Sequence, residues 1–253
     1  MSQYDAIAHV YDRLNAELDY GAWADFVEAN FARHLPARPS LVLDLACGTG
    51  SMTHELAARG YDMIGVDRSP EMLSEAYARA GETMPLFLCQ DMRSFELYGT
   101  VGAVVCCLDS INYLTADGDL ERCFSTVHNY LDPDGLFLFD VNTPYKFAHT
   151  YGDNAYILED ELDGRSIFCG WQNAFDPSSG LCDFYLTLFE EDDDGRFIRA
   201  EETQHERCYT HDALLAALEK TGFAHLDTYA DYQFGAPTDT TERWYIAARA
   251  IKH

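Results

Sequence analysis

Short apolar segments alternate with helical patterns along the middle of this chain. The apolar segments span residues 41–46, 62–67, 85–91, 101–109 and 135–142. Apolar residues recur at helical spacing in most of the intervals between them. This alternation is typical of parallel strands joined by crossover helices, so the sequence predicts a doubly wound α/β sheet. The segment at 101–109, VGAVVCCLD, is apolar almost throughout, which indicates a central strand covered on both faces.

The pattern changes between residues 145 and 208. Period-two stretches at 166–174 and 183–190, separated by the turn clusters DPSSG and DDDG, predict an inserted antiparallel sheet. Helical periodicity resumes at residues 211–223, and two further strands are predicted at 225–233 and 242–250. We therefore expect a core formed by residues 1–144 and 209–253, with helical residues 1–35 at its start. Residues 145–208 form the predicted subdomain, which we call the insert.

The charge balance argues against several classes of partner. The chain has 17 Lys and Arg against 43 Asp and Glu, a formal net charge of −26. The insert alone has five Lys and Arg against fifteen Asp and Glu. Nucleic-acid binding depends on neutralising phosphates with basic side chains, so we expect no nucleic-acid partner and no binding to anionic membranes.

Cysteine usage and hydropathy indicate the cellular compartment. The eight cysteines are scattered, without a C-x-x-C pair or the histidine spacing of a zinc site, so we expect reduced, mostly buried thiols and no metal. No apolar run approaches the roughly 18 to 20 residues that cross a bilayer, and the opening residues lack the pattern of a secretory signal. We expect a soluble, cytoplasmic protein.

Acidic residues and glycines occupy the ends of the predicted parallel strands, where ligands bind in sheets of this kind. Asp44 lies in the stretch DLACGTG, whose Gly48 and Gly50 allow a sharp turn and close approach to a ligand. Asp67 ends the second strand, where a carboxylate is able to accept hydrogen bonds from a ribose diol. Asp91 ends the third, in a position to accept from an adenine amine. These carboxylates predict one pocket.

A dinucleotide site is the main alternative, because it also uses a glycine loop followed by an acid on the second strand. The loop here reads G-T-G-S-M-T, so the third glycine of G-x-G-x-x-G is missing. Asp44 would also lie close to a bound pyrophosphate. A cationic ligand fits this pattern better.

Four motifs in this order resemble those of the class I S-adenosylmethionine-dependent methyltransferases. They are LVLDLACGTG, VDRSPEML, CQDM and CCLDSINYL. The opening YDAIAHVYDRLNAELDYGAWADFV resembles a bacterial small-molecule subgroup that carries an antiparallel insert after strand five. The resemblance implies a Rossmann-like seven-stranded methyltransferase sheet with an inserted antiparallel β subdomain, and N-terminal helices that form a lid together with the insert.

The resemblance also implies a role for particular residues in binding S-adenosylmethionine. Asp44 and the backbone of Ala46, Cys47 and Gly48 would bind its methionine part, although the broader pattern often has glycine at position 46. Asp67 would bind the ribose, Arg68 and Met72 would flank the adenine, Asp91 and Met92 would bind its edge, and Leu108 would contact the donor amine through its backbone. Tyr11, Tyr20 and Trp23 would cover the site, with packing in the core or lid as their alternative role.

Methyl transfer is an in-line displacement that mainly requires alignment of the reactants, so little acid–base machinery is needed. If the acceptor is a hydroxyl or an amine, a base is needed for its proton, and the polar candidates are His205, Tyr113 and Arg207. A purely structural role for His205 is the alternative. The segment LDSINY lacks the N-P-P-Y run that binds planar amide or adenine nitrogens, so we expect a small-molecule acceptor.

Two other functions remain open at this point. The chain could bind S-adenosylmethionine without turnover, as a sensor or an assembly partner whose acidic insert docks a basic protein. It could also methylate protein or RNA, which would require a basic face that the composition hardly provides.

Overall fold

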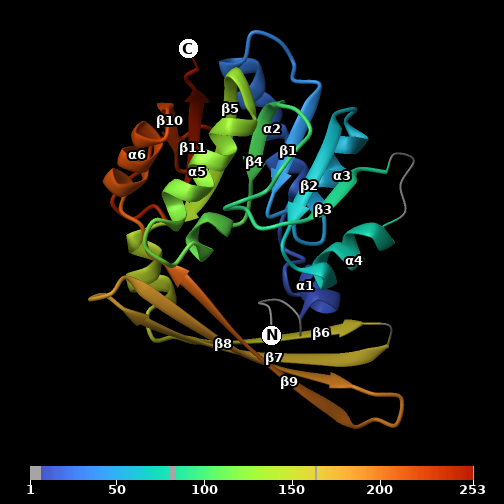
Figure 1. Cartoon of the computed structure of the whole chain (residues 1–253). Helices are drawn as coiled ribbons and strands as arrows, with labels where there is room; N and C mark the ends of the chain where they lie inside the picture. Colours follow the sequence, from blue (N-terminus) through green and yellow to red (C-terminus); the bar gives the residue numbers. More distant parts are fainter. Residues whose placement is uncertain (1–6, 80–83, 163, 253) are drawn as a thin grey trace.

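The computed structural model describes residues 7–79, 84–162 and 164–252, and contains two β-sheets. In Figure 1 the larger sheet lies above the smaller one. The larger sheet has the strand order β10-β11-β5-β4-β1-β2-β3. Its strands are β1 (Leu41–Leu45), β2 (Asp62–Asp67), β3 (Leu86–Cys89), β4 (Val101–Cys106), β5 (Leu131–Asn142), β10 (Phe223–Tyr229) and β11 (Arg243–Ala250). The strands from β5 to β3 pair in parallel, whereas β11 pairs antiparallel with both β5 and β10. The predicted α/β class is confirmed.

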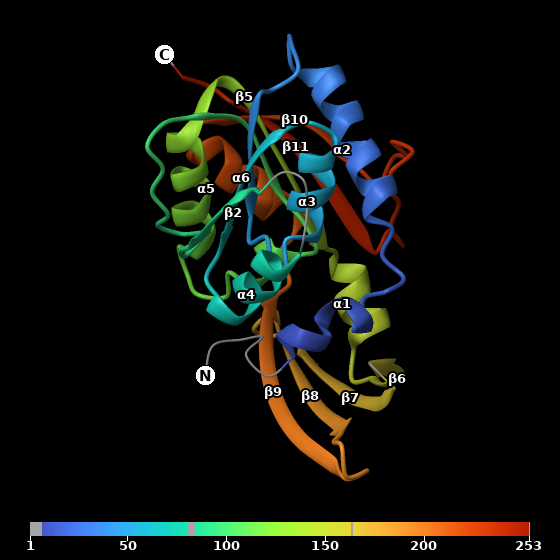
Figure 2. The same ribbon diagram turned by 90° about the vertical axis from the view of Figure 1, so that its right-hand side faces the viewer.

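Helices cover both faces of the larger sheet. They are α2 (Tyr20–His34), α3 (Ser51–Ala58), α4 (Pro70–Ala78), α5 (Asp119–Tyr130) and α6 (His211–Lys220), with the shorter η1 (Ala8–Val10), α1 (Tyr11–Leu14), η2 (Ser110–Tyr113) and η3 (Lys146–Tyr151). Figure 2 shows α5 and α6 on one side of the sheet and α2 and α3 on the other. None of the helices in the described part of the chain is long and apolar enough to span a bilayer.

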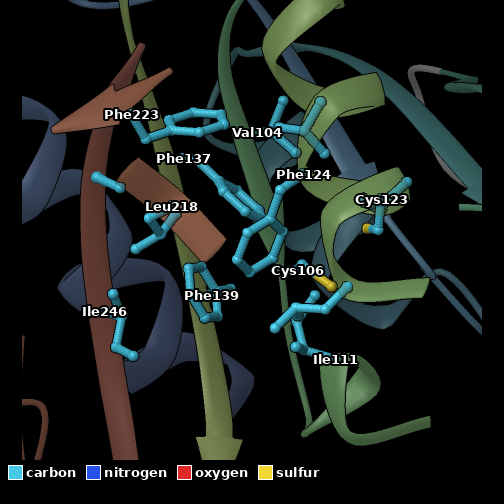
Figure 3. Packing of buried hydrophobic residues seen from close by; sticks show 14 of the residues in the cluster. Val104, Cys106, Ile111, Cys123, Phe124, Phe137, Phe139, Leu218, Phe223 and Ile246 are labelled. Carbon is cyan, nitrogen blue, oxygen red and sulfur yellow. The ribbon is translucent and has the colours of Figure 1, made fainter. Parts of the chain in front are cut away.

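The strands are apolar on both faces because each face packs against helices. Leu43 and Leu45, which are two residues apart, belong to the core cluster with α5 and α6, whereas Val42, the residue before Leu43, belongs to the cluster with α2 and α3. Phe137 and Phe139 of β5 meet Phe124 of α5, with ring centroids 5.4 and 5.3 Å from it (Figure 3). This two-sided burial accounts for the nearly continuous apolar runs in the sequence.

The insert contains the second sheet, with strands β6 (Ala155–Leu162), β7 (Arg165–Asp176), β8 (Leu181–Glu191) and β9 (Phe197–Arg207), all antiparallel in chain order. Alternate residues of β8 are buried, as the period-two pattern predicted. These residues, among them Phe184, pack against Val10 of η1 and Phe147 of η3. The short N-terminal helices therefore lie against the insert.

Local signals placed several boundaries correctly. Ser69 and Pro70 are residue types typical of a helix start, and Ser69 caps α4: its side chain accepts a hydrogen bond from the Met72 amide, and Pro70 follows at the first helical position. The residues DPDG at 132–135 have the composition of a tight turn before the predicted strand at 135–142, but they lie inside β5. Val101 pairs with Leu131 and Ala103 pairs with Leu136, so the four residues DPDG bulge out of a ladder that continues on both sides.

Candidate functional site

A cavity of about 260 Å³ opens at the carboxyl ends of β1 to β4. All the predicted site residues except Trp23 and Arg207 line it. They are Tyr11, Tyr20, Asp44, Ala46, Cys47, Gly48, Asp67, Arg68, Met72, Asp91, Met92, Leu108, Tyr113 and His205. The structure thus brings residues from the N-terminal helices, four strand ends and the insert to one place.

The loop between β1 and α3 turns sharply to form one wall of the cavity. Ala46, Gly48 and Gly50 all have positive φ, at 58°, 54° and 74°. A Cβ on Gly48 would meet nothing within 4 Å, whereas a Cβ on Gly50 would lie 3.0 Å from both Ala76 and Phe87. Gly48 is therefore needed for its backbone conformation, and Gly50 is needed for close packing as well.

Asp67 ties the end of β2 to this loop. One carboxylate oxygen accepts a hydrogen bond from the Gly48 amide at 2.9 Å, and the other accepts from the Ser69 amide at 2.8 Å. Burial raises the pKa of Asp67, and the two backbone amides act in the opposite direction. The carboxylate is held in one orientation at the cavity wall before any ligand binds.

Asp44 is the most buried acid of the cavity, with 1% of its surface exposed. Its carboxylate accepts a hydrogen bond from the hydroxyl of Thr53 in α3 at 2.5 Å. Burial raises its pKa to about 7. A positively charged ligand would lower this pKa and stabilise the carboxylate, so the environment of Asp44 favours a cation. Sequence reasoning missed Thr53, which lies one helical turn after the glycine loop.

The carboxylate of Asp91, predicted to bind the adenine edge, is already paired with an arginine of this protein. The guanidinium of Arg93 donates to both of its oxygens, at 2.8 and 2.5 Å, and this pairing lowers the pKa of Asp91. Arg93 also donates to Asp119 of α5 at 2.9 Å. Both Arg93 and Asp119 line the cavity. They were not predicted, because nothing in their residue type or sequence spacing indicates that the segment after β3 contacts the start of α5.

The N-terminal segment is fastened to the glycine loop beside the cavity. Asp12 of α1 accepts hydrogen bonds from Thr49 at 2.7 Å and from Ser51 at 3.2 Å, and it forms an ion pair with Arg79 at the end of α4. This docking brings Tyr11 to the cavity. Burial raises the pKa of Tyr20, the other predicted aromatic of this wall, to about 12.

Trp23 is a correction to the sequence prediction. It lies in α2, most of which is a core helix packed on the sheet, and only the first residue of this helix, Tyr20, lines the cavity. The Trp23 ring packs against Tyr232 and Tyr245, with centroids 5.8 and 6.0 Å away, and is 3% exposed. The alternative of core packing therefore holds for Trp23.

The insert contributes His205 to the exposed end of the cavity. The Nδ1 atom of His205 lies 2.6 Å from a carboxylate oxygen of Asp183, its partner on the adjacent strand β8. The hydroxyl of Tyr113 donates to Gln204 at 2.9 Å. Arg207 is the second correction: it does not line the cavity, and its guanidinium donates to Asp117 at 3.1 Å.

The arrangement as a whole suits a ligand with both a cationic and a nucleoside part. A buried carboxylate lies near the end of β1 and a partly buried one at the end of β2, and both apolar and polar side chains line the rest of the cavity. Within the described residues no group of three or more His, Cys, Asp or Glu side chains is placed to bind a metal ion.

Comparison with known proteins gives consistent results. A family model described as a methyltransferase domain matches residues 42–135. A putative methyltransferase of Bacillus subtilis (strain 168) is 34% identical over 251 residues, which cover 98% of each chain. The crystal structure of an S-adenosylmethionine-dependent methyltransferase from Clostridium acetobutylicum matches with a TM-score of 0.86 and 31% identity, over 98% of this chain and 99% of that one.

A more partial match has a named acceptor. It is the dTDP-3-amino-3,4,6-trideoxy-alpha-D-glucopyranose N,N-dimethyltransferase of Streptomyces venezuelae, 31% identical over 165 residues. The match covers 63% of this chain and 66% of that protein.

Proposed function

Since the chain belongs to the class I S-adenosylmethionine-dependent methyltransferases, we propose that it methylates an amine nitrogen of a small molecule. The observation that carries this proposal is the continuity of one cavity from the strand-end carboxylates to Tyr113 and His205. The donor would bind at the carboxylates, and the acceptor would enter from the end formed by the insert.

The lining residues fit S-adenosylmethionine. The buried Asp44 would face its positively charged methionine part, and the pre-oriented Asp67 would accept hydrogen bonds from the ribose. Met72 and Met92 would pack against the adenine, with Asp91 and Arg93 at its polar edge. The donor supplies a methyl group on a positively charged sulfur, whose carbon is open to in-line displacement. The protein's task is to align the two reactants and exclude water.

An amine acceptor is supported by two observations. The Streptomyces relative is named for dimethylation of an amino sugar nitrogen. The acids that line the cavity, together with the net charge of the chain, would attract an ammonium group. An ammonium must lose a proton before its nitrogen attacks, and His205, oriented by Asp183, would accept that proton.

Methyl transfer from labelled donor tests the acceptor class. We expect label to pass to small primary amines, including amino sugars, and not to the matched compounds that carry a hydroxyl in place of the amine. Transfer to the hydroxyl compounds alone would contradict the proposal.

Donor binding tests the site separately. Calorimetry should show that Asp67→Ala weakens binding of S-adenosylmethionine at least about tenfold, because a carboxylate that accepts ribose hydrogen bonds is lost. Asp62→Ala is the matched control, since Asp62 lies exposed at the opposite end of the same strand. Equal affinity of the two variants would remove Asp67 from the donor site.

We also propose a cytoplasmic location for the enzyme. The support is the chemistry of the eight cysteines, which are free thiols and are mostly buried.

A further inference from the structure

Charged side chains from both sheets meet behind the cavity wall. Asp109 follows β4, Asp140 lies in β5 and Arg243 lies in β11. Arg243 pairs with Asp140 and, at 2.7 Å, with Asp109. Glu206 of β9 comes from the insert, and its carboxyl lies beside that of Asp109. Asp140 is fully buried and Glu206 is 3% exposed, so water screens these groups weakly.

This cluster holds an unusual turn in place. Leu108 and Asp109 are consecutive residues with positive φ, at 58° and 51°, a conformation that is unfavourable for a residue with a side chain. The Asp109 amide donates to Asp140 at 2.9 Å, and Arg243 binds both carboxylates. The neighbours of Asp109 in the chain, Leu108 and Ser110, line the cavity. The cluster therefore determines where this wall of the donor site lies.

Glu206 connects the same turn to the insert. Its carboxyl accepts a hydrogen bond from Asn142 at 3.2 Å, and Asn142 is itself at the end of β5. Two carboxyl groups buried side by side do not both ionise readily, so one of them is favoured to keep a proton. Burial, followed by the charge of Asp109, raises the pKa of Glu206 well above its usual value. Burial opposes ionisation of Asp109 too, but Arg243 and Lys146 outweigh it and lower the pKa of Asp109. These two directions favour a proton on Glu206, whose hydroxyl would then donate to Asp109.

We propose that Glu206 is a positioning residue that fastens the insert to the Leu108–Asp109 turn, so that docking of the insert and binding of the donor stabilise each other. The proposal concerns the donor site of the family and is independent of the acceptor class. Glu206 touches neither reactant in this scheme and acts through Asp109.

The proposal implies a specific response to alkaline pH. When Glu206 loses its proton, two adjacent carboxylates repel each other and the joint weakens. The other charged or titratable groups around Glu206 are Lys146 and Tyr151 of η3, Cys182 on the adjacent strand β8, and Arg243. Glutamine at position 206 would keep both hydrogen bonds, since its amide nitrogen donates to Asp109 and its oxygen accepts from Asn142, but it does not titrate.

The test measures binding of S-adenosylhomocysteine by calorimetry, without acceptor, from about pH 6 to about pH 10. At neutral pH we expect Glu206→Gln to bind within about threefold of the wild type and Glu206→Ala to bind about tenfold more weakly. The wild type should lose affinity at alkaline pH more steeply than Glu206→Gln. Glu201→Gln, an exposed acid on the same strand, should follow the wild type throughout.

Wild-type affinity in a folded Glu206→Ala would overturn the proposal. If Glu206→Ala does not fold, the comparison of pH profiles decides: the same alkaline loss in Glu206→Gln as in the wild type would overturn it. Failure to methylate amines would affect the proposed acceptor only, because this experiment contains no acceptor.

Discussion

Thr53 donates its hydroxyl to the buried carboxylate of Asp44 at 2.5 Å, and this hydrogen bond joins the first turn of α3 to the end of β1. Thr53 is itself fully buried. The pair lies beneath the glycine loop, where the positive part of the donor is expected to bind. Electrostatics at this point of the cavity therefore depends on a residue that is not part of the glycine loop motif.

Replacing Thr53 tests the importance of this hydrogen bond. Thr53→Val keeps the shape of the side chain but leaves a buried carboxylate without its hydroxyl donor. Loss of such a hydrogen bond costs about 1–3 kcal/mol of interaction free energy. We expect donor affinity to fall about five- to tenfold, measured by calorimetry at neutral pH. Thr53→Ser keeps the hydroxyl and should bind nearly as well as the wild type. Equal affinities for the valine and serine variants would contradict this role.

Donor binding should depend on pH through Asp44. Burial raises its pKa to about 7, so in the free protein the carboxyl is protonated below that pH. A cationic donor favours the ionised form, so affinity should fall as the pH drops from about 8 to about 5.5, and binding near pH 7 should release a proton. Calorimetry in buffers of different ionisation enthalpy measures that proton. Asp44→Asn should bind weakly and lose this part of the pH dependence.

The same shift affects the stability of the free protein. A raised pKa in the folded state means that the folded protein binds this proton more tightly than the unfolded chain does. The contribution of Asp44 is therefore complete below the unfolded pKa, near 3.8, and is lost as the pH rises through about 7. Chemical denaturation at about pH 5 and pH 8, compared with Asp44→Asn, measures it. A pH dependence identical in the two proteins would contradict the assignment.

His205 and Asp183 should affect turnover and not donor binding. His205→Ala removes the proposed base, so we expect unchanged donor affinity and a kcat lowered about 10²-fold or more. Asp183→Asn keeps the shape but removes the carboxylate beside Nδ1, and should lower kcat less and alter the pH–rate profile. Steady-state kinetics with an identified amine acceptor provides the measurement. Unaltered kcat in His205→Ala would remove this residue from the mechanism.

The two glycines of the loop should differ in their tolerance of alanine. Gly48→Ala places a Cβ in open space, so its only cost is that alanine disfavours a positive φ. We expect it to lower the free energy of unfolding by about 1 kcal/mol. Gly50→Ala adds a Cβ 3.0 Å from Ala76 and Phe87 as well, so we expect a further loss of about 1–3 kcal/mol. Denaturant unfolding of the two variants measures the difference. Equal stabilities would show that the contact at Gly50 relaxes without cost.

Much of the lining of the candidate donor site could be predicted because its residues stand at the ends of segments that are recognisable locally. Asp44, Asp67 and Gly48 follow apolar runs, and the carboxyl ends of neighbouring parallel strands meet at one edge of a sheet. Trp23 was misplaced because an aromatic residue at helical spacing serves core packing and ligand cover equally well. Arg93 and Asp119 escaped prediction because their contact joins the segment after β3 to the start of α5, and no local pattern relates these two parts of the chain.

The sequence by itself determined the alternation of strands and helices, the position of the insert and the acids at the strand ends, since periodicity and turn chemistry act between residues close in the chain. Only the tertiary structure decided which side chains face the cavity and which buried acidic groups lie together. Glu206 and Asp109 are far apart in the chain, and their contact exists because the two sheets pack together and exclude water from the space between them.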